Sequence, residues 1–142
     1  MKQGFVKVAS ATPRIRVADP VYNAQVICEQ AKEAAEHGAK IVVFPELCIT
    51  GYTCNDLFLQ ELLLEKAKEA LLTIAEETGQ LETLFLVGLP VDKDGRLYNV
   101  AAVLYRGRIL GMIPKKNIPM YAEFYDCLLY TSPSPRDKRQ SR

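Results

Sequence analysis

Apolar and polar residues alternate near the start of the chain and then recur at every third or fourth position. Residues 5–11 (FVKVASA) alternate and contain β-branched valines, a pattern that predicts a strand. The apolar stripe of a following helix is formed by Val21, Ala24, Cys28, Ala31 and Ala35. Asp19 suits the N-cap, Pro20 suits the first helical position, and Gly38 suits the left-handed residue after a helix end. We therefore expect a helix from Pro20 to about His37.

A second strand and helix follow in the same order. Residues 41–44 (IVVF) form a short continuous apolar run, which predicts a strand buried on both faces. Residues 59–78 again carry apolar positions at helical spacing, with Gly79 as the C-terminal cap, and residues 83–88 are another apolar run. This alternation of strand and helix with short links predicts βαβ units and parallel strands.

The chain then changes to hairpin connections. Asp94-Gly95 predicts a tight turn, and two strands are expected at residues 97–105 and 108–113, on either side of Arg106-Gly107. Strands joined by such short turns are antiparallel. The sequence therefore predicts an α/β fold whose sheet mixes parallel and antiparallel strands.

Composition excludes several classes of protein. The chain has 142 residues, 49% of them hydrophobic and 25% charged, and a formal net charge of +1. These values are typical of a folded globular domain and give no indication of a nucleic-acid or membrane surface. No apolar run approaches the length of about 18 residues that a membrane span requires, and the first residues lack a signal-peptide core. We expect a cytoplasmic protein.

The cysteines do not form a metal-binding pattern. Cys28, Cys48, Cys54 and Cys127 contain no C-x-x-C pair, and His37 is the one histidine. No metal site is therefore predicted, and all four cysteines are expected to be free thiols, buried as small apolar side chains. His37 falls in the last turn of the first predicted helix, where it favours the helix dipole, so we interpret it as structural.

The last residues differ from the rest in composition. Residues 127–142 contain Ser-Pro-Ser-Pro and a basic run, with no helical or strand period. We expect a domain over residues 1–126 and a disordered tail over residues 127–142. The string CLLYTSPSPRDKRQSR resembles translated sequencing-adapter read-through, so the tail is expected not to be native. The alternative is a genuine short variant that ends in a disordered tail.

Two charged residues follow predicted strands and are candidates for chemistry. Glu46 comes just after the strand at residues 41–44, at the strand end where α/β proteins build their sites. Lys115 follows Pro114 at the end of the strand at residues 108–113, and could supply a fixed positive charge to an oxyanion. Position alone also allows a surface glutamate and a solvated lysine, the more so because Lys116 is adjacent. Tyr52 and Tyr121 each lie six residues beyond one of the two and could line a pocket or simply pack.

Two segments together carry a resemblance to a known family. Residues 44–52 (FPELCITGY) resemble the first signature of the nitrilase superfamily of carbon–nitrogen hydrolases. Residues 107–126 (GRILGMIPKKNIPMYAEFYD) resemble its second signature, in the form found in the amidase domain of glutamine-dependent NAD synthetases. The departures from that form are Lys116, Ile118, Met120 and Asp126. The lysine directly after proline is the family's catalytic position, which selects Lys115.

The resemblance implies a fold and a site. The fold is an α-β-β-α sandwich, of which residues 1–126 would be the N-terminal part. The site is a Glu-Lys-Cys triad, with Glu46 as the general base and Lys115 as the cation that stabilises the oxyanion. Tyr121 matches a position that contacts bound glutamine, and Tyr52 is expected in the same pocket. The nucleophile lies further downstream in the family, so none of the four cysteines is assigned to it.

The resemblance also implies a function for the parent protein. This domain would hydrolyse L-glutamine, and a C-terminal synthetase domain with ATP and magnesium would use the ammonia to amidate deamido-NAD. No cofactor is expected in this segment, and family members commonly form homo-oligomers. The alternatives are a stand-alone amidohydrolase for another small amide and a non-catalytic binding or assembly module of the same fold. The chain alone is expected to hydrolyse glutamine no faster than background, and its unfinished sheets to favour aggregation.

One geometric expectation follows from these assignments. Glu46 and Lys115 should lie at neighbouring strand ends, with their side chains converging on one concavity, although they are far apart in the sequence.

Overall fold

The computed structural model describes residues 4–51 and 61–116 of the chain. Tyr52, Tyr121, Cys54, Cys127 and the tail at residues 127–142, all subjects of the predictions above, lie outside the described residues. The elements in chain order are β1 (Val8–Ser10), α1 (Pro20–Glu36), β2 (Ile41–Val43), α2 (Glu61–Glu77), β3 (Leu84–Lys93), β4 (Arg96–Tyr105) and β5 (Arg108–Pro114).

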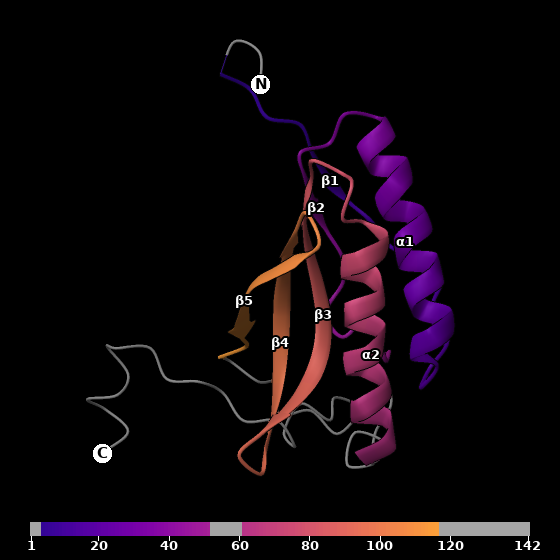
Figure 1. The fold of residues 1–142 in the computed structure, drawn as a ribbon, viewed down its shortest axis with the longest axis vertical. Helices are drawn as coiled ribbons and strands as arrows, with labels where there is room; N and C mark the ends of the chain where they lie inside the picture. Colours follow the sequence, from indigo (N-terminus) through magenta and orange to yellow (C-terminus); the bar gives the residue numbers. More distant parts are fainter. Residues whose placement is uncertain (1–3, 52–60, 117–142) are drawn as a thin grey trace, which may run out of the picture.

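The strands form one mixed sheet in sequence order, β1-β2-β3-β4-β5. The pairs β1–β2 and β2–β3 are parallel, whereas β3–β4 and β4–β5 are antiparallel. Figure 1 shows α1 and α2 side by side on one side of this sheet. The prediction of an α/β fold with a mixed sheet is confirmed, and the described part forms a helix layer on a sheet layer.

Helix α1 begins and ends where its capping residues predict. The Asp19 side chain accepts a hydrogen bond from the Tyr22 backbone N–H at 3.1 Å, and Pro20 is the first helical residue. At the other end His37 is the C-cap, its ring Nδ1 lies 2.8 Å from the Glu33 carbonyl oxygen, and Gly38 adopts a φ of +86°. His37 therefore lies at the helix end, as its structural interpretation requires.

The hydrophobic core lies between the two helices and the facing side of the sheet. The largest side chains buried there include Ile27, Val42, Leu71, Ile74, Phe85, Val87 and Leu104. Complete burial of one such side chain stabilises the fold by about 1.5–3 kcal/mol. The core also contains small helical residues: Ala24 and Ala31 on α1, and Ala67 and Ala70 on α2.

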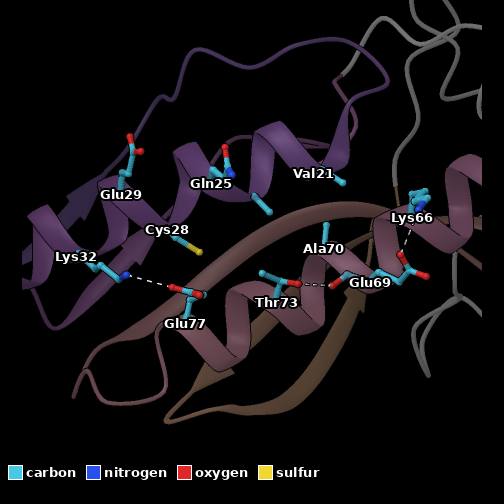
Figure 2. Close-up of a pocket in the computed structure, with 11 residues that line it drawn as sticks. Val21, Gln25, Cys28, Glu29, Lys32, Lys66, Glu69, Ala70, Thr73 and Glu77 are labelled. Atoms are coloured by element: carbon cyan, nitrogen blue, oxygen red, sulfur yellow. Dashed lines mark hydrogen bonds and ion pairs between the residues drawn. The ribbon is translucent and has the colours of Figure 1, made fainter.

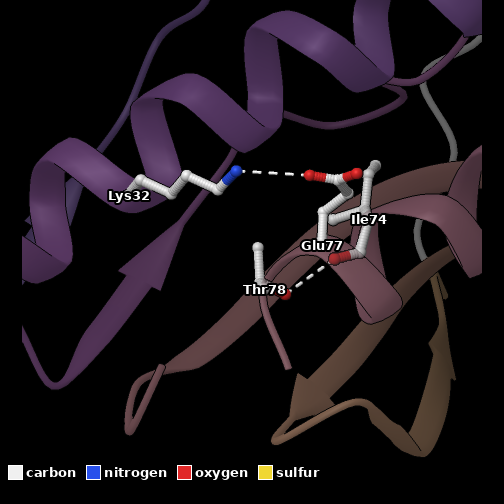
Figure 3. Close-up of polar contacts among 4 residues, drawn as sticks. All are labelled: Lys32, Ile74, Glu77 and Thr78. Carbon is white, nitrogen blue, oxygen red and sulfur yellow. Dashed lines mark hydrogen bonds and ion pairs between the residues drawn. The ribbon is translucent and has the colours of Figure 1, made fainter. Parts of the chain in front are cut away.

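A polar contact joins the two helices at the protein surface. Lys32 on α1 forms an ion pair with Glu77 on α2, with 3.2 Å between Nζ and Oε2 (Figure 3). Beside it the Thr78 hydroxyl donates to the Ile74 carbonyl oxygen at 2.7 Å, and this hydrogen bond satisfies a carbonyl group in the last turn of α2. Both charged side chains of the pair are about half exposed, so the ion pair contributes little stability.

The other face of the sheet is apolar and exposed. Val42 and Phe44 point toward the helices and are buried, whereas Val43 is 44% exposed and Ile113 on β5 is 58% exposed. The prediction that residues 41–44 are buried on both faces was therefore wrong. The described residues provide a helix layer on one face of the sheet, and Val43 belongs to the opposite face.

Strand β3 is longer than the apolar run at residues 83–88 predicts. It continues through Gly88 and Pro90 to Lys93 and pairs with β4 over its whole length, from Leu84 with Tyr105 to Lys93 with Arg96. Asp94 and Gly95 form the predicted turn, with φ values of +55° and +74°. Within the described residues, no helix has the length and apolar character that a membrane crossing demands.

Candidate active site

Glu46 lies on a turn that crosses directly over β3. The turn follows β2, and it passes so close to Gly88 that a Cβ there would lie 2.9 Å from the Pro45 carbonyl oxygen. Leu47 has a positive φ of +54°, and the Ile49 N–H donates to the Gly88 carbonyl oxygen at 3.1 Å. A glycine at position 88 is therefore what allows the backbone around Glu46 to sit on the sheet.

A buried asparagine anchors the rest of this loop. The Asn23 side-chain amide donates to the carbonyl oxygens of Ile49 at 2.8 Å and Arg16 at 2.7 Å, and its oxygen accepts from the Arg16 N–H at 2.7 Å. The Ala18 N–H also donates to the Thr50 carbonyl oxygen at 2.7 Å. The segment after Glu46 is thus tied to α1 and to the loop before it, which fixes where the turn can lie.

Lys115 reaches the same place from β5. Its backbone N–H donates to the Asn99 carbonyl oxygen at 2.7 Å, one residue beyond the last strand pair of Val100 with Pro114. Its side-chain Nζ lies 2.6 Å from Glu46 Oε1, and the two side chains are 27% and 37% exposed. The structure therefore brings together the two residues that the sequence analysis selected, 69 positions apart.

The strands that carry the pair are not neighbours, contrary to expectation. β3 and β4 lie between β2 and β5 in the sheet. The gap is bridged because the turn after β2 crosses β3 at Gly88, which carries Glu46 toward β4.

Asn99 on β4 completes the cluster and was missed in the sequence. Its side-chain amide donates to Glu46 Oε1, the same oxygen that Lys115 contacts, and only 2% of the residue is exposed. The available signal was a lone amide in the otherwise apolar and aromatic run of residues 97–105. A buried amide in such a strand needs a specific hydrogen-bond partner, which the sequence alone does not identify.

A shallow cavity of about 410 Å³ surrounds these polar groups. Its apolar walls come from the exposed face of the sheet, and include Val43, Leu86, Ala101 and Ile113. Glu46, Asn99 and Lys115 also line it and supply its polar atoms. A carboxylate, an amide and an ammonium group in an apolar hollow can orient a small polar ligand.

Neither described cysteine is suited to supply a thiolate to this site. Burial raises the pKa of the Cys48 thiol to about 12, and its sulfur lies 3.7 Å from the Gly88 carbonyl oxygen as a hydrogen-bond donor. Burial, with Glu77 nearby, raises the pKa of Cys28 to about 11. Both are free and buried, as predicted for these two. Across the described ranges, no group of three or more potential metal ligands occurs.

A second and larger cavity, of about 590 Å³, lies between α1 and α2 (Figure 2). Its walls carry Val21, Cys28 and Thr73, and the charged groups at its edge include the paired Lys66 and Glu69, 3.7 Å apart. The Thr73 hydroxyl is committed to the Glu69 carbonyl oxygen at 3.0 Å. The Cys28 thiol is protonated near neutral pH, and the groove lacks the contact of carboxylate, amide and ammonium groups on one oxygen that is found at Glu46.

Comparison with known protein families identifies the family of this chain. The profile described as carbon-nitrogen hydrolase matches residues 7–136, which include Glu46, Asn99 and Lys115. The chain belongs to the carbon–nitrogen hydrolase family.

Individual carbon–nitrogen hydrolases show which branch this chain resembles. It is 39% identical over 125 residues to the glutamine-dependent NAD(+) synthetase of Mycobacterium bovis, covering 88% of this chain and 18% of that protein. It is 35% identical over 133 residues to the enzyme of the same name from Acinetobacter baylyi, covering 94% of this chain and 24% of that protein. The chain thus spans less than a quarter of the length of these curated relatives.

Solved structures share the fold. The glutamine-dependent NAD(+) synthetase from Cytophaga hutchinsonii superposes with a TM-score of 0.83 at 28% identity, over 92% of this chain and 22% of that one. An amidase from Nesterenkonia sp. superposes with a TM-score of 0.75 at 22% identity, over 95% of this chain and 52% of that one. The predicted nitrilase-type fold is confirmed for this member of the carbon–nitrogen hydrolase family.

Proposed function

We propose that this chain is the N-terminal part of the glutaminase domain of a glutamine-dependent NAD synthetase, and that Glu46 and Lys115 are its general base and its oxyanion-stabilising cation. The observation that carries the proposal is the 2.6 Å contact between the two side chains in an apolar hollow. The names and identities of the relatives support the assignment to this branch of the family. Tyr52 and Tyr121, outside the described residues, are proposed to contact glutamine.

The reaction is shared between these groups and a nucleophilic cysteine, a role that we assign to none of the four cysteines of this chain. The Glu46 carboxylate takes the proton of the cysteine thiol, and the thiolate attacks the side-chain amide carbon of glutamine. Negative charge then develops on the amide oxygen, where the Lys115 ammonium stabilises it. Glu46 returns the proton to the leaving nitrogen, the C–N bond breaks, and ammonia departs. Water hydrolyses the thioester, with Glu46 again as base, to give glutamate and the free thiol.

The role of the whole protein follows from its ammonia product. A synthetase domain that binds ATP and magnesium would use the ammonia to amidate deamido-NAD. The proposal places no cofactor in this segment, because a base, a cation and a cysteine thiol suffice for the hydrolysis of an amide through a thioester. We further propose that the protein works in the cytoplasm as a homo-oligomer built through this domain.

The activity of the chain by itself is the first test. Ammonia release from glutamine should not exceed background, because none of the four cysteines is assigned to the nucleophile position and the buried Cys28 and Cys48 do not form thiolates near neutral pH. The measurement is made on the purified 142-residue chain before and after alkylation of all four cysteines. Clear activity that alkylation abolishes would contradict the prediction, and Cys127 would be the first cysteine to replace, since it alone follows the Lys115 segment.

A chimera tests the proposed function directly. Residues 1–126 of this chain replace the matching segment of the Acinetobacter baylyi synthetase, which retains the rest of that protein. NAD synthesis is then measured with glutamine and, separately, with added ammonia, which bypasses the glutaminase site. We expect both activities in the chimera. Synthesis with ammonia but not with glutamine would contradict the proposed function and favour an amidase for another substrate or a non-catalytic module.

Two substitutions in the chimera test the roles of the pair. Glu46→Gln and Lys115→Met should each lower glutamine-dependent synthesis by at least about 100-fold, the scale of a lost base or oxyanion donor. Ammonia-dependent synthesis should be unchanged in both. Lys116→Met is the matched control, since it removes the same charge one residue away and should leave both activities intact.

A further inference from the structure

We propose that Asn99 is a positioning residue that holds Glu46 and Lys115 in their productive arrangement, through its side chain on one and its backbone on the other. The geometric part stands on the contacts alone, whereas its catalytic consequence rests on the function proposed above. Asn99 lies on β4, in register with Pro90 on β3. It is therefore built into the most extensive strand pairing of the sheet.

The burial of Asn99 requires an explanation. Only 2% of the residue is exposed, and it occupies the sheet face that carries Ala101 and Val103. Burying an amide without partners costs several kcal/mol, whereas an apolar residue at this position would carry no such cost. The side-chain amide donates to one specific acceptor, Glu46 Oε1. An asparagine at this position therefore makes sense as a partner for the carboxylate rather than as a packing residue.

The three residues close a ring of contacts. The Asn99 side chain donates to Glu46 Oε1, Lys115 Nζ donates to the same oxygen at 2.6 Å, and the Lys115 N–H donates to the Asn99 carbonyl oxygen at 2.7 Å. Asn99 contacts Glu46 through its side chain and Lys115 through its backbone carbonyl, and of the three residues it is the one that lies within a paired strand. Movement of its backbone or its side chain would therefore change the distance between the base and the cation.

The ion pair alone would hold the Glu46 and Lys115 side chains only loosely. Lys115 carries its charge on a flexible chain of four methylene groups, and both charged side chains are partly exposed to water. Exposed ion pairs contribute between zero and about 1 kcal/mol, because solvent screens them and side-chain entropy opposes them. The buried amide supplies a donor on a rigid strand and adds no net charge to the site. It also places two donors on Glu46 Oε1, which leaves Oε2 as the oxygen that would exchange the proton.

Two variants of the 142-residue chain separate positioning from stability. Asn99→Leu removes the donor, and Asn99→Asp keeps the shape but replaces the donor with a second carboxylate. Thr83→Val is the matched control. It also removes one buried side-chain hydrogen bond, from the Thr83 hydroxyl to the Ala39 carbonyl oxygen at 2.9 Å, but just before β3 begins, at the opposite end of the strands from the site.

The readout is the NMR signal of the Lys115 ammonium group, with its scalar coupling across the hydrogen bond to the labelled Glu46 carboxylate carbon. We expect the ratio of paired to unpaired Lys115 to fall roughly fivefold in Asn99→Leu, the change that loss of one net hydrogen bond brings. A larger fall is expected in Asn99→Asp. Thr83→Val should keep the parent coupling. An unchanged coupling in both Asn99 variants would overturn the proposal, as would loss of folding in both while Thr83→Val remains folded.

The chimera with the Acinetobacter baylyi synthetase gives the catalytic readout. Asn99→Leu should lower kcat for glutamine by about tenfold or more with little change in KM, because small misplacements of reacting groups reduce the rate of the chemical step. Ammonia-dependent synthesis should be unchanged. A parent chimera inactive with glutamine would count against the proposed function, whereas a parent-like kcat in Asn99→Leu would overturn the positioning role.

Discussion

Gly88 and Leu47 belong to different elements, yet their backbones touch. A Cβ on Gly88 would overlap the Leu47 backbone nitrogen and would lie 3.1 Å from the Glu46 carbonyl carbon. Leu47 itself adopts a left-handed conformation, with a φ of +54°, at the point of contact. The position of Glu46 above the sheet therefore depends on the absence of a side chain at residue 88.

Gly88→Ala should separate Glu46 from Lys115. The methyl group meets backbone on the turn rather than a flexible side chain, so the turn must lift or the sheet must distort. Overpacking of this kind costs about 1–3 kcal/mol. Denaturant unfolding measures the loss, and the NMR coupling between Lys115 and Glu46 reports the geometry. Gly111→Ala is the control, because a Cβ at Gly111 meets nothing within 4 Å. Equal effects of the two substitutions would contradict this account.

The two buried thiols should make stability fall at alkaline pH. Burial raises the pKa of Cys28 and Cys48 from 9.0 to about 11 and about 12, so the unfolded chain loses these protons first. Below pH 9 both states keep the protons and there is no effect. Above it, the unfolded state is favoured increasingly up to the folded pKa values. The free energy of unfolding should thus decline between pH 9 and about 11, more steeply than in a Cys28→Ser, Cys48→Ser double variant. Identical profiles would contradict the burial of these thiols.

Asn23→Leu should be strongly destabilising. The substitution leaves the Ile49 and Arg16 carbonyl oxygens and the Arg16 N–H without the partner that Asn23 supplies inside the fold. Each buried group left unsatisfied costs about 1–3 kcal/mol, so a total loss of about 3 kcal/mol or more is expected in denaturant unfolding. A loss below about 1 kcal/mol would show that water replaces the amide at this position.

The surface pair of Lys32 and Glu77 should matter far less. Glu77→Gln should change the free energy of unfolding by less than about 1 kcal/mol, because both side chains are about half exposed. The small difference should disappear in 1 M salt, where the screening length is about 3 Å. Glu65→Gln is a control on the same helix, within a pair at a longer distance of 3.7 Å. A large, salt-independent loss in Glu77→Gln alone would contradict this expectation.

Sequence patterns located the elements well because the signals that end them are local. Asp19 and Pro20 mark the start of α1, and Asp94-Gly95 marks a turn whose two positive φ values both residues tolerate. The apolar run at residues 41–44 did not indicate whether one or both faces of its strand are buried. An apolar strand is equally apolar whether one or both of its faces are covered, so the exposure of Val43 could be learned only from the packing.

The candidate site was predicted in part. Glu46 and Lys115 could be selected because each follows a strand and because two segments resemble a family signature. Their 2.6 Å contact depends on the crossing of β3 at Gly88, which is a tertiary feature. Asn99 was missed for the same reason: its partner lies 53 residues earlier, on an element with which β4 does not pair. Tyr52 and Tyr121 stay predictions.

The sheet combines two modes of connection, and this has a kinetic consequence. β3, β4 and β5 follow one another through the two-residue turns Asp94-Gly95 and Arg106-Gly107, so their contacts are local and can form early. β2 meets β3 only after the whole of α2 has been placed between them, which demands slower, long-range loop closure. Asn99 and Lys115 belong to the early meander, whereas Glu46 arrives with the late βαβ unit. Pairing of Lys115 with Glu46 is therefore a marker for completed folding. In a refolding chain, β3, β4 and β5 should pair before Glu46 contacts Lys115.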